Sequence, residues 1–327
     1  MSGMATNAGP GGPASPDSPA TIGFIGLGVM GAAMCRNLVR KSGLPVTVYD
    51  VVKTAVRWLA TEGAHAAASP AGVAADVVFC SLPGHRELEE VLTGEDGVIA
   101  ALSELPGRSG RRPVIVDLGT SSVEYTRQLA SLADEKGIAY CDAPVARTRQ
   151  AAADGTLAVM VGGDRDVAER IHPLLDCMAT DVTYCGPAGS GQIVKQLNNM
   201  VLFQNVLAIA EAHAIATAAG LDGALLFDAL TKGSADSFAL RNHGMKAILA
   251  DDYPLNAFST DYALKDLSYA LELAAATEVA ARGAELVHHV LTAARDAGWA
   301  SQYFPVLRRL VGAPGEARSN GPAQRDV

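Results

Sequence analysis

A lysine and an asparagine stand one helical turn apart in a segment that is predicted to form a long helix. Lys195 and Asn199 are four residues apart, so they share one face of that helix. The positive end of the helix and desolvation in a closed cleft would both favour the neutral amine, which suits a group that exchanges a proton near neutral pH. Such an amine takes the proton that oxidation of an alcohol releases, and as an ammonium it donates to a carbonyl oxygen during reduction. Asn199 could hold the same substrate, and the plainer alternative is an exposed helical lysine.

A glycine-rich turn near the start of the chain is typical of a dinucleotide site. An apolar run leads into the turn, a helix-forming stretch follows, and a second apolar run stops at Asp50. Gly28 would let backbone amides approach a pyrophosphate at the helix N-terminus, and Asp50 would accept hydrogen bonds from an adenosine ribose. The turn residues predicted to contact the cofactor are Gly26, Leu27, Gly28, Val29, Met30 and Gly31. Glycines that serve only the packing of a tight turn are the alternative.

Charge indicates which cofactor this site prefers. The carboxylate of Asp50 would repel a 2′-phosphate, and the next residues, Val51 and Val52, are apolar. The sequence therefore predicts NAD, while Lys53 and Arg57 lie close enough in the chain to keep NADP possible.

Two further segments follow predicted strands, where ligands collect in open α/β sheets. Leu82 and Pro83 would form an apolar wall for a nicotinamide ring, and Thr120 or Ser122 could hydrogen-bond the ring or the substrate. As ordinary strand-ending turns, these segments would need no ligand.

An α/β fold is needed to bring these residues together. Short apolar runs alternate with helical stretches, which predicts a Rossmann-type, doubly wound and mostly parallel sheet domain followed by an all-α domain. The predicted strands are 21–26, 46–50, 77–81, 113–117, 138–141, 157–161 and 182–185. The predicted helices of the second half are 190–219, closed by Gly220, one from 222, then 238–250, 260–276, 283–297 and a last one to 310.

This pattern divides the chain into four parts. Residues 21–187 are predicted to form an NAD-binding Rossmann domain, and residues 188–311 an all-α substrate and oligomerisation domain. The ends, 1–20 and 312–327, have the composition of disordered tails.

Composition and charge argue against several classes of protein. The 327 residues carry a formal net charge of −9 and no long stripe of Lys and Arg, so no nucleic-acid partner is expected. No apolar stretch is recognised as long enough to span a bilayer, so no membrane partner is expected. The five cysteines have no C-x-x-C spacing, which fits a reducing, cytoplasmic setting. A metal site is not predicted, because the chain lacks H-E-x-x-H and any Cys/His cluster.

Several segments form a series of motifs in a fixed order. They are 23–31, 117–120, 142–145, 155–157, 160–163, 195–199, and Phe258 followed by Lys265 and Asp266. In this order they resemble the β-hydroxyacid dehydrogenase family, which includes 3-hydroxyisobutyrate dehydrogenase and tartronate semialdehyde reductase. The resemblance implies that Lys195 is the catalytic acid/base, that Asn199 helps to bind substrate, and that Phe258 and Lys265 lie near the cofactor. It also implies a homodimer or homotetramer formed through the helical half.

The segment after Val145 departs from that family. Where the family commonly has Ser-Gly-Gly, this chain has Ala146, Arg147 and Thr148, all assigned to the substrate site. Ala146 removes a hydroxyl that would hold a substrate carboxylate, and Arg147 could replace it with a bidentate anion fork. A similar Arg-Thr pair occurs in a branch that resembles sulfolactaldehyde reductase. An Arg147 that points to solvent is the alternative.

The leading prediction is an NAD-dependent oxidoreductase that interconverts a small β-hydroxyacid and its semialdehyde, with Lys195 as the acid/base. One alternative is a reductase of a sulfonated or otherwise anionic aldehyde. A second is an imine reductase, a group that typically lacks the lysine, and a third is a decarboxylating sugar-phosphate dehydrogenase, for which the helical half is too short. An alternative of another class is a redox sensor that binds a dinucleotide without turnover.

Overall fold

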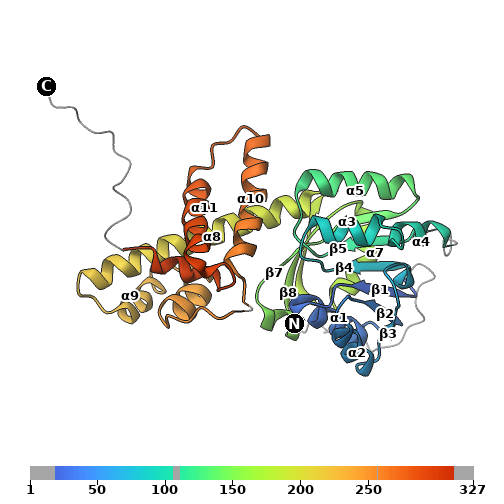
Figure 1. Cartoon of the computed structure of the whole chain (residues 1–327), viewed down its shortest axis with the longest axis horizontal. Helices are drawn as coiled ribbons and strands as arrows, with labels where there is room; N and C mark the ends of the chain where they lie inside the picture. The colour runs from blue at the N-terminus through green and yellow to red at the C-terminus, as the bar shows by residue number, and fades with distance from the viewer. Residues whose placement is uncertain (1–18, 106–110, 256, 313–327) are drawn as a thin grey trace, which may run out of the picture. The chain divides into compact units, whose positions relative to one another are not determined.

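The computed structural model describes residues 19–105, 111–255 and 257–312, and it divides into two compact units (Figure 1). Unit 1 comprises the chain up to Thr120 together with Glu124–Gln192, and unit 2 comprises Ser121–Val123 and the chain from Ile193 onward. The predicted domain boundary after residue 187 lies just before helix α8 (Ser190–Ala218), whereas the division between the units falls inside that helix. The predicted tails lie outside the described residues except for positions 19, 20 and 312.

Unit 1 is built on a sheet whose described part has nine strands. They are β1 (Ile22–Ile25), β2 (Val46–Tyr49), β3 (His65–Ala66), β4 (Val77–Cys80), β5 (Val114–Asp117), β6 (Ala139–Asp142), β7 (Val145–Ala146), β8 (Leu157–Gly162) and β9 (Ala179–Gly186). The order is β3-β2-β1-β4-β5-β6-β8-β7, and β9 pairs with β8. All pairs are parallel except β6 with β8 and β7 with β8. The predicted doubly wound, mostly parallel sheet is therefore confirmed.

Helices cover both faces of this sheet (Figure 1). They are α1 (Val29–Lys41), α2 (Lys53–Thr61), α3 (His85–Thr93), α4 (Val98–Glu104), α5 (Val123–Glu135), α6 (Arg149–Asp154) and α7 (Arg165–Leu175), with a short 3-10 helix η1 (Ala71–Val73). Successive strand residues point to opposite faces. Phe24 accordingly packs in one apolar cluster with Met34 of α1, and Ile25 packs in another with Leu88 of α3. Each face of the sheet thus has its own core.

Unit 2 is helical, as predicted. It contains most of α8, then α9 (Gly223–Leu230), the π-helix η3 (Leu240–Ile248), α10 (Thr260–Ala276), α11 (Arg282–Ala294), the π-helix η4 (Arg295–Trp299) and the 3-10 helix η5 (Phe304–Arg309). Gly220 follows α8 with a φ of +80°, the left-handed conformation expected of a C-terminal glycine cap. The ring centroids of Phe203 and Phe304 lie 5.1 Å apart within the apolar core of this unit.

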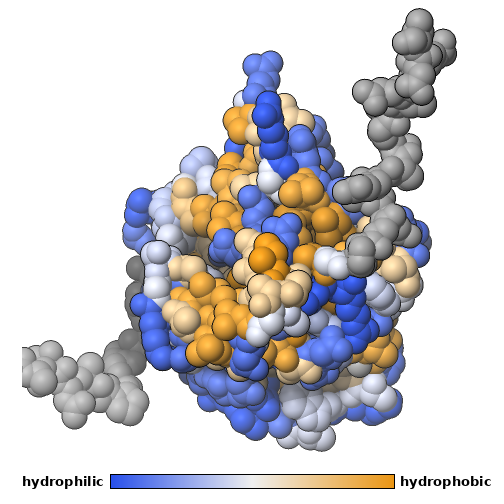
Figure 2. All heavy atoms as spheres, turned by 90° about the vertical axis from the view of Figure 1, so that its left-hand side faces the viewer, coloured by the Kyte–Doolittle hydropathy of each residue, from blue (hydrophilic) through white to orange (hydrophobic). Residues whose placement is uncertain are grey.

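The apolar character of α8 corrects one expectation. An 18-residue window of this 29-residue helix has a mean hydropathy of 1.4, enough by length and composition to cross a membrane, so the statement that no such stretch exists is wrong. Helices in the core of a protein can be equally long and apolar. Because α8 supplies Phe203, Val206 and Ala210 to the core of unit 2, a core helix is favoured. Only 33% of the window is buried. The face that carries α9 shows further apolar side chains gathered at the surface (Figure 2).

Candidate active site

The glycine turn between β1 and α1 owes its shape to the absence of side chains at Gly26 and Gly31. Gly26 has a φ of +89°, and a Cβ there would lie 2.2 Å from the carbonyl oxygen of Ser81. A Cβ on Gly31 would lie 1.9 Å from the carbonyl oxygen of Gly26, so α1 can pack on the turn only with glycine at this position. Gly28 is the N-cap of α1, where no described side chain accepts from the free amides and the first turn has no acidic residue. These amides are therefore suited to bind a pyrophosphate.

Asp50 lies directly beside this turn. Its Oδ2 accepts a hydrogen bond from the amide of Leu27 at 2.5 Å, and its Oδ1 accepts one from the amide of Val52 at 2.6 Å. The carboxylate thus joins the glycine turn to the end of β2, where an adenosine ribose is expected in this fold. The ammonium of Lys53 lies 4.8 Å from the ring centroid of Tyr49 and 3.4 Å from the carbonyl oxygen of Asp50.

Leu82 connects two of the predicted cofactor segments within unit 1. A Cβ on Gly26 would lie 3.1 Å from the Leu82 side chain, and a Cβ on Gly119 would lie 3.1 Å from the Leu82 carbonyl oxygen. The structure therefore brings together the turns after β1, β4 and β5, as the strand-end argument predicts. Pro83 is exposed, and Thr120 in the third of these turns is half-buried.

A buried carboxylate holds the first turn of α8. Asp142, at the end of β6, accepts hydrogen bonds from the amides of Gly189 at 2.7 Å and Gln192 at 2.8 Å. Burial raises the pKa of Asp142 above its ordinary value, and these backbone hydrogen bonds oppose part of that rise. Asp142 belongs to a recognised sequence motif, but its role could not be predicted because its partners lie 47 and 50 residues along the chain.

The second group of predicted residues lies in unit 2. Asn199 donates from Nδ2 to Oδ2 of Asp266 at 2.8 Å, and Nζ of Lys265 lies 3.2 Å from Oδ1 of the same carboxylate. Lys195, half-buried, is on the same helix face as Asn199. Burial lowers the pKa of Lys195, Asp266 opposes that shift, and Lys265 adds to it. The lowering of the amine pKa is therefore caused mainly by desolvation. Asp266 and Lys265 shift that pKa in opposite directions.

Asp266 is the residue of this cluster that residue-by-residue reasoning missed. It is 4% exposed, and as a carboxylate in a predicted helix it gave no signal beyond its place in a family motif. Phe258, predicted near the cofactor, is half-buried and lies 5.6 Å from Phe203 and 5.5 Å from Phe304 between ring centroids. It packs against the core of unit 2, so its cofactor role stays a prediction.

The segment from Ala146 to Thr148 lies in unit 1 beside β8 and β9. Ala146 is half-buried in β7, and the hydroxyl of Thr148 caps α6 by accepting from the amide of Ala151. Arg147 has a φ of +89° and donates to the Thr156 carbonyl at 2.7 Å, to the Thr180 hydroxyl at 2.9 Å and to the Asp181 carboxylate at 2.7 Å. These contacts use three of the five guanidinium N–H groups. Arg147 thus neither points freely into solvent nor offers its whole fork, and its role toward an anion stays a prediction.

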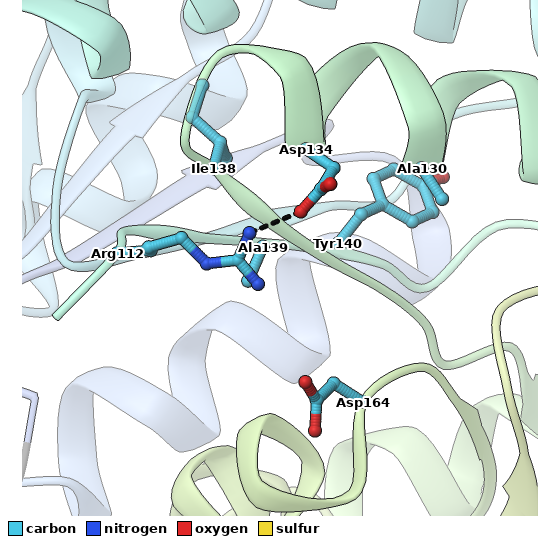
Figure 3. A pocket seen from close by; sticks show the side chains of 7 residues that line it. All are labelled: Arg112, Ala130, Asp134, Ile138, Ala139, Tyr140 and Asp164. Carbon is cyan, nitrogen blue, oxygen red and sulfur yellow. Dashed lines mark hydrogen bonds and ion pairs between the residues drawn. The ribbon is translucent and has the colours of Figure 1, made fainter.

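The described residues also include a pocket away from the glycine turn. A pocket of about 210 Å³ lies at the amino ends of β5 and β6, the edge opposite to the glycine turn, and its lining includes Arg112, Asp134 and Asp164 (Figure 3). Arg112 and Asp134 already form an ion pair there. Across the described residues, no group of three or more His, Cys, Asp or Glu side chains could hold a metal ion.

Two family models match the chain. Residues 21–186 match the NAD-binding domain of 6-phosphogluconate dehydrogenase, and residues 189–308 match the NAD-binding domain of NADP-dependent 3-hydroxyisobutyrate dehydrogenase. Among curated relatives, a 2-(hydroxymethyl)glutarate dehydrogenase of Eubacterium barkeri is 37% identical over 77% of this chain and 81% of the relative. An NAD-dependent L-serine dehydrogenase of Pseudomonas aeruginosa is 33% identical over 88% of this chain and 97% of the relative.

A solved structure shows the same likeness in three dimensions. The 3-hydroxyisobutyrate dehydrogenase of Mycobacterium tuberculosis, described with L-serine, has a TM-score of 0.79 and 34% identity over 89% of this chain and 98% of that chain. Matches of this identity and extent cover both the glycine turn and the helix of Lys195. The chain therefore belongs to the β-hydroxyacid dehydrogenase family, whose members are NAD(P)-dependent dehydrogenases and reductases that act on CH–OH groups.

Proposed function

We propose that this protein interconverts a small β-hydroxyacid and its semialdehyde, with Lys195 as the general acid/base. The observation that carries the proposal is the cluster of Lys195, Asn199, Lys265 and Asp266, in which burial lowers the pKa of the catalytic amine. The names of the relatives support the substrate class, because 2-(hydroxymethyl)glutarate and L-serine both carry a CH2OH group β to a carboxylate.

The chain's own residues then divide the work. The glycine turn of residues 26–31 would hold the dinucleotide, which would supply a hydride acceptor for oxidation and a hydride donor for reduction. Neutral Lys195 removes the hydroxyl proton during oxidation, and its ammonium returns a proton to the carbonyl oxygen during reduction. Asn199 holds the substrate in place, and its carboxamide is itself oriented by Asp266. Because Asp266 is charged and close, it limits how far the lysine pKa falls.

Replacement of Lys195 by alanine tests this assignment. We expect kcat for a panel of 3-hydroxyacids to fall by about 10²- to 10⁴-fold, the usual contribution of a general acid/base. NADH affinity, measured by fluorescence titration, should stay near the wild-type value. Lys246→Ala, which removes an exposed lysine of the same unit, is the matched control and should retain full turnover. Near-normal turnover of Lys195→Ala would exclude the lysine, and silence of the wild type across the panel with NADH binding intact would favour a non-catalytic sensor.

We also propose that NAD is preferred over NADP. The support is the position of the Asp50 carboxylate at the end of β2 beside Leu27, where it would repel a 2′-phosphate. We expect kcat/KM for NAD to exceed that for NADP by at least about tenfold, which corresponds to about 1.4 kcal/mol. Asp50→Asn should narrow the ratio, and a wild-type preference for NADP would overturn the assignment.

The exposed apolar surface of unit 2 supports a further part of the proposal, self-association. Ile215, Leu225 and Phe238 are 70%, 56% and 51% exposed. Apolar surface of this kind is typical of a protein interface. A homodimer or homotetramer should be visible by light scattering of the purified chain.

A further inference from the structure

Two fully buried glutamines on α8 bind the turn that follows β5. Gln192 donates from Nε2 to the carbonyl oxygen of Gly119 at 3.0 Å, and Gln196 donates from Nε2 to the carbonyl oxygen of Ser121 at 2.8 Å. The first contact lies within unit 1 and the second within unit 2. The glutamines are one helical turn apart, so both point from one face of α8.

Hydrogen bonds to its backbone hold this turn. Residues 118–122 connect β5 to α5 without belonging to a helix or a strand. The amide of Gly119 donates to the Asp117 carboxylate at 2.8 Å, and the two glutamines satisfy the carbonyls on either side of Thr120. A buried carbonyl without a partner is costly, so each glutamine amide fixes the peptide that it binds.

We propose that Gln192 and Gln196 are positioning residues for the reaction, which act by fixing the turn that carries Thr120. The inference rests on the proposed function and on the sequence prediction that Thr120 or Ser122 hydrogen-bonds the nicotinamide ring or the substrate. A displacement of about 1 Å at a reacting group can lower a rate by up to about 10²-fold, so a loosened turn should slow the hydride step. Neither glutamine touches the reacting atoms in this account.

Apolar substitutions test the inference directly. In Gln192→Met and Gln196→Met the side chain keeps its length but loses the N–H donor. We expect each variant to lower kcat by about tenfold, while KM for NAD changes by less than about threefold. The primary deuterium isotope effect on kcat should rise, because hydride transfer becomes slower relative to the other steps. Gln128→Met on the exposed face of α5 is the matched control and should leave all of these values unchanged.

The rate of amide hydrogen exchange reports how firmly the turn is held, and it does not depend on enzymatic activity. Mass spectrometry of peptides that cover residues 118–123 should show exchange about tenfold faster in both methionine variants than in the wild type. Faster exchange with an unchanged kcat would overturn the positioning role. It would still show that the wild-type glutamines hold the turn. Unchanged exchange and unchanged kcat would overturn the inference entirely. If the wild type turns over no hydroxyacid, the proposed function has failed, and the exchange data still decide whether the glutamines hold the turn.

Gln196→Glu provides a second variant if the methionine changes impair folding. A carboxylate cannot donate to the Ser121 carbonyl, whereas a protonated carboxyl can. Burial raises the pKa of such a group, so protonation should fall within reach of assay conditions. We expect the ratio of variant to wild-type kcat for aldehyde reduction to rise as the pH is lowered. A ratio that does not depend on pH would contradict the role of the donor.

Discussion

The two units hold their predicted site residues in different physical forms. The nucleotide turn of unit 1 is made of backbone groups, and its shape depends on side chains that are absent, as at Gly31, where a Cβ would lie 1.9 Å from a carbonyl oxygen. The cluster of unit 2 is made of side chains, most of them charged. The pKa of Lys195 there depends on burial and on the charges of Asp266 and Lys265. The first should therefore respond to added volume and the second to changed charge.

Among the variants that compare the two units, two glycine substitutions in unit 1 should have the largest effect, on NADH binding. Gly31→Ala forces a contact with the Gly26 carbonyl, and overpacking of this kind costs about 1–3 kcal/mol. Gly28→Ala meets no described atom within 4 Å, so its stability should change little while its methyl group obstructs the pyrophosphate. We expect both variants to weaken NADH binding by about 10²-fold (about 2.7 kcal/mol), but only Gly31→Ala to melt at a clearly lower temperature.

The measurements are a thermal melt and a fluorescence titration with NADH. Gly233→Ala controls for the removal of a glycine as such, because this exposed glycine has no positive φ and a Cβ there would have its nearest neighbours at 3.8 Å. A Gly28 variant that lost more stability than the Gly31 variant would show that the turn is not shaped by the contact described here.

The difference between the units also explains which features could be predicted from sequence. The strands β1, β2, β4 and β5 and helix α10 follow from local apolar patterns, and the predicted span 260–276 agrees with α10 as observed. The edge strands β3 and β7 were missed because each has two residues and exists only through its pairing with β2 or β8. For the same reason β9 was predicted too short, since its first residues are strand only beside β8.

Site residues show the same limit. The glycine turn has a local signature, because steric needs fix the residue type within a few positions. Asp142, Gln196 and Asp266 have no such signature. Their partners are 47 to 75 residues away in sequence, so the contacts depend on the folded chain. Lys195 could be predicted from helix position and motif, whereas the charges that set its pKa could not.

Two charge changes in unit 2 should move the pH profile in opposite directions. Asp266 raises the pKa of Lys195, so Asp266→Asn should lower it and shift the rise of kcat for alcohol oxidation to lower pH. Lys265 lowers that pKa, so Lys265→Met should shift the rise to higher pH. We expect displacements of about one pH unit, typical of a nearby charge. The profiles should be measured at saturating NAD, and shifts in the same direction would show that the electrostatic description is incorrect.

The smallest effect is expected at Arg147. Its guanidinium lies in unit 1, but its interactions include an ion pair with Asp181. Asp181 neutralises it and two other acceptors occupy it, which leaves two N–H donors for the acid group of a substrate. Arg147→Gly should therefore raise KM for the hydroxyacid only several-fold, or about 1 kcal/mol. Glycine also accepts the φ of +89° at this position without strain, so stability should change little.

Asp181→Asn distinguishes an anion fork from a purely structural ion pair. If Arg147 binds the substrate anion, loss of the competing carboxylate should lower KM, opposite to the effect of Arg147→Gly. If the ion pair only holds β7 against β8 and β9, both substitutions loosen the same segment and should change KM in the same direction. Steady-state kinetics of the two variants and their double mutant separate these outcomes, because a shared structural contact gives non-additive effects. Opposite signs would show that at Arg147, as proposed for Asp50, charge rather than backbone shape sets affinity in unit 1.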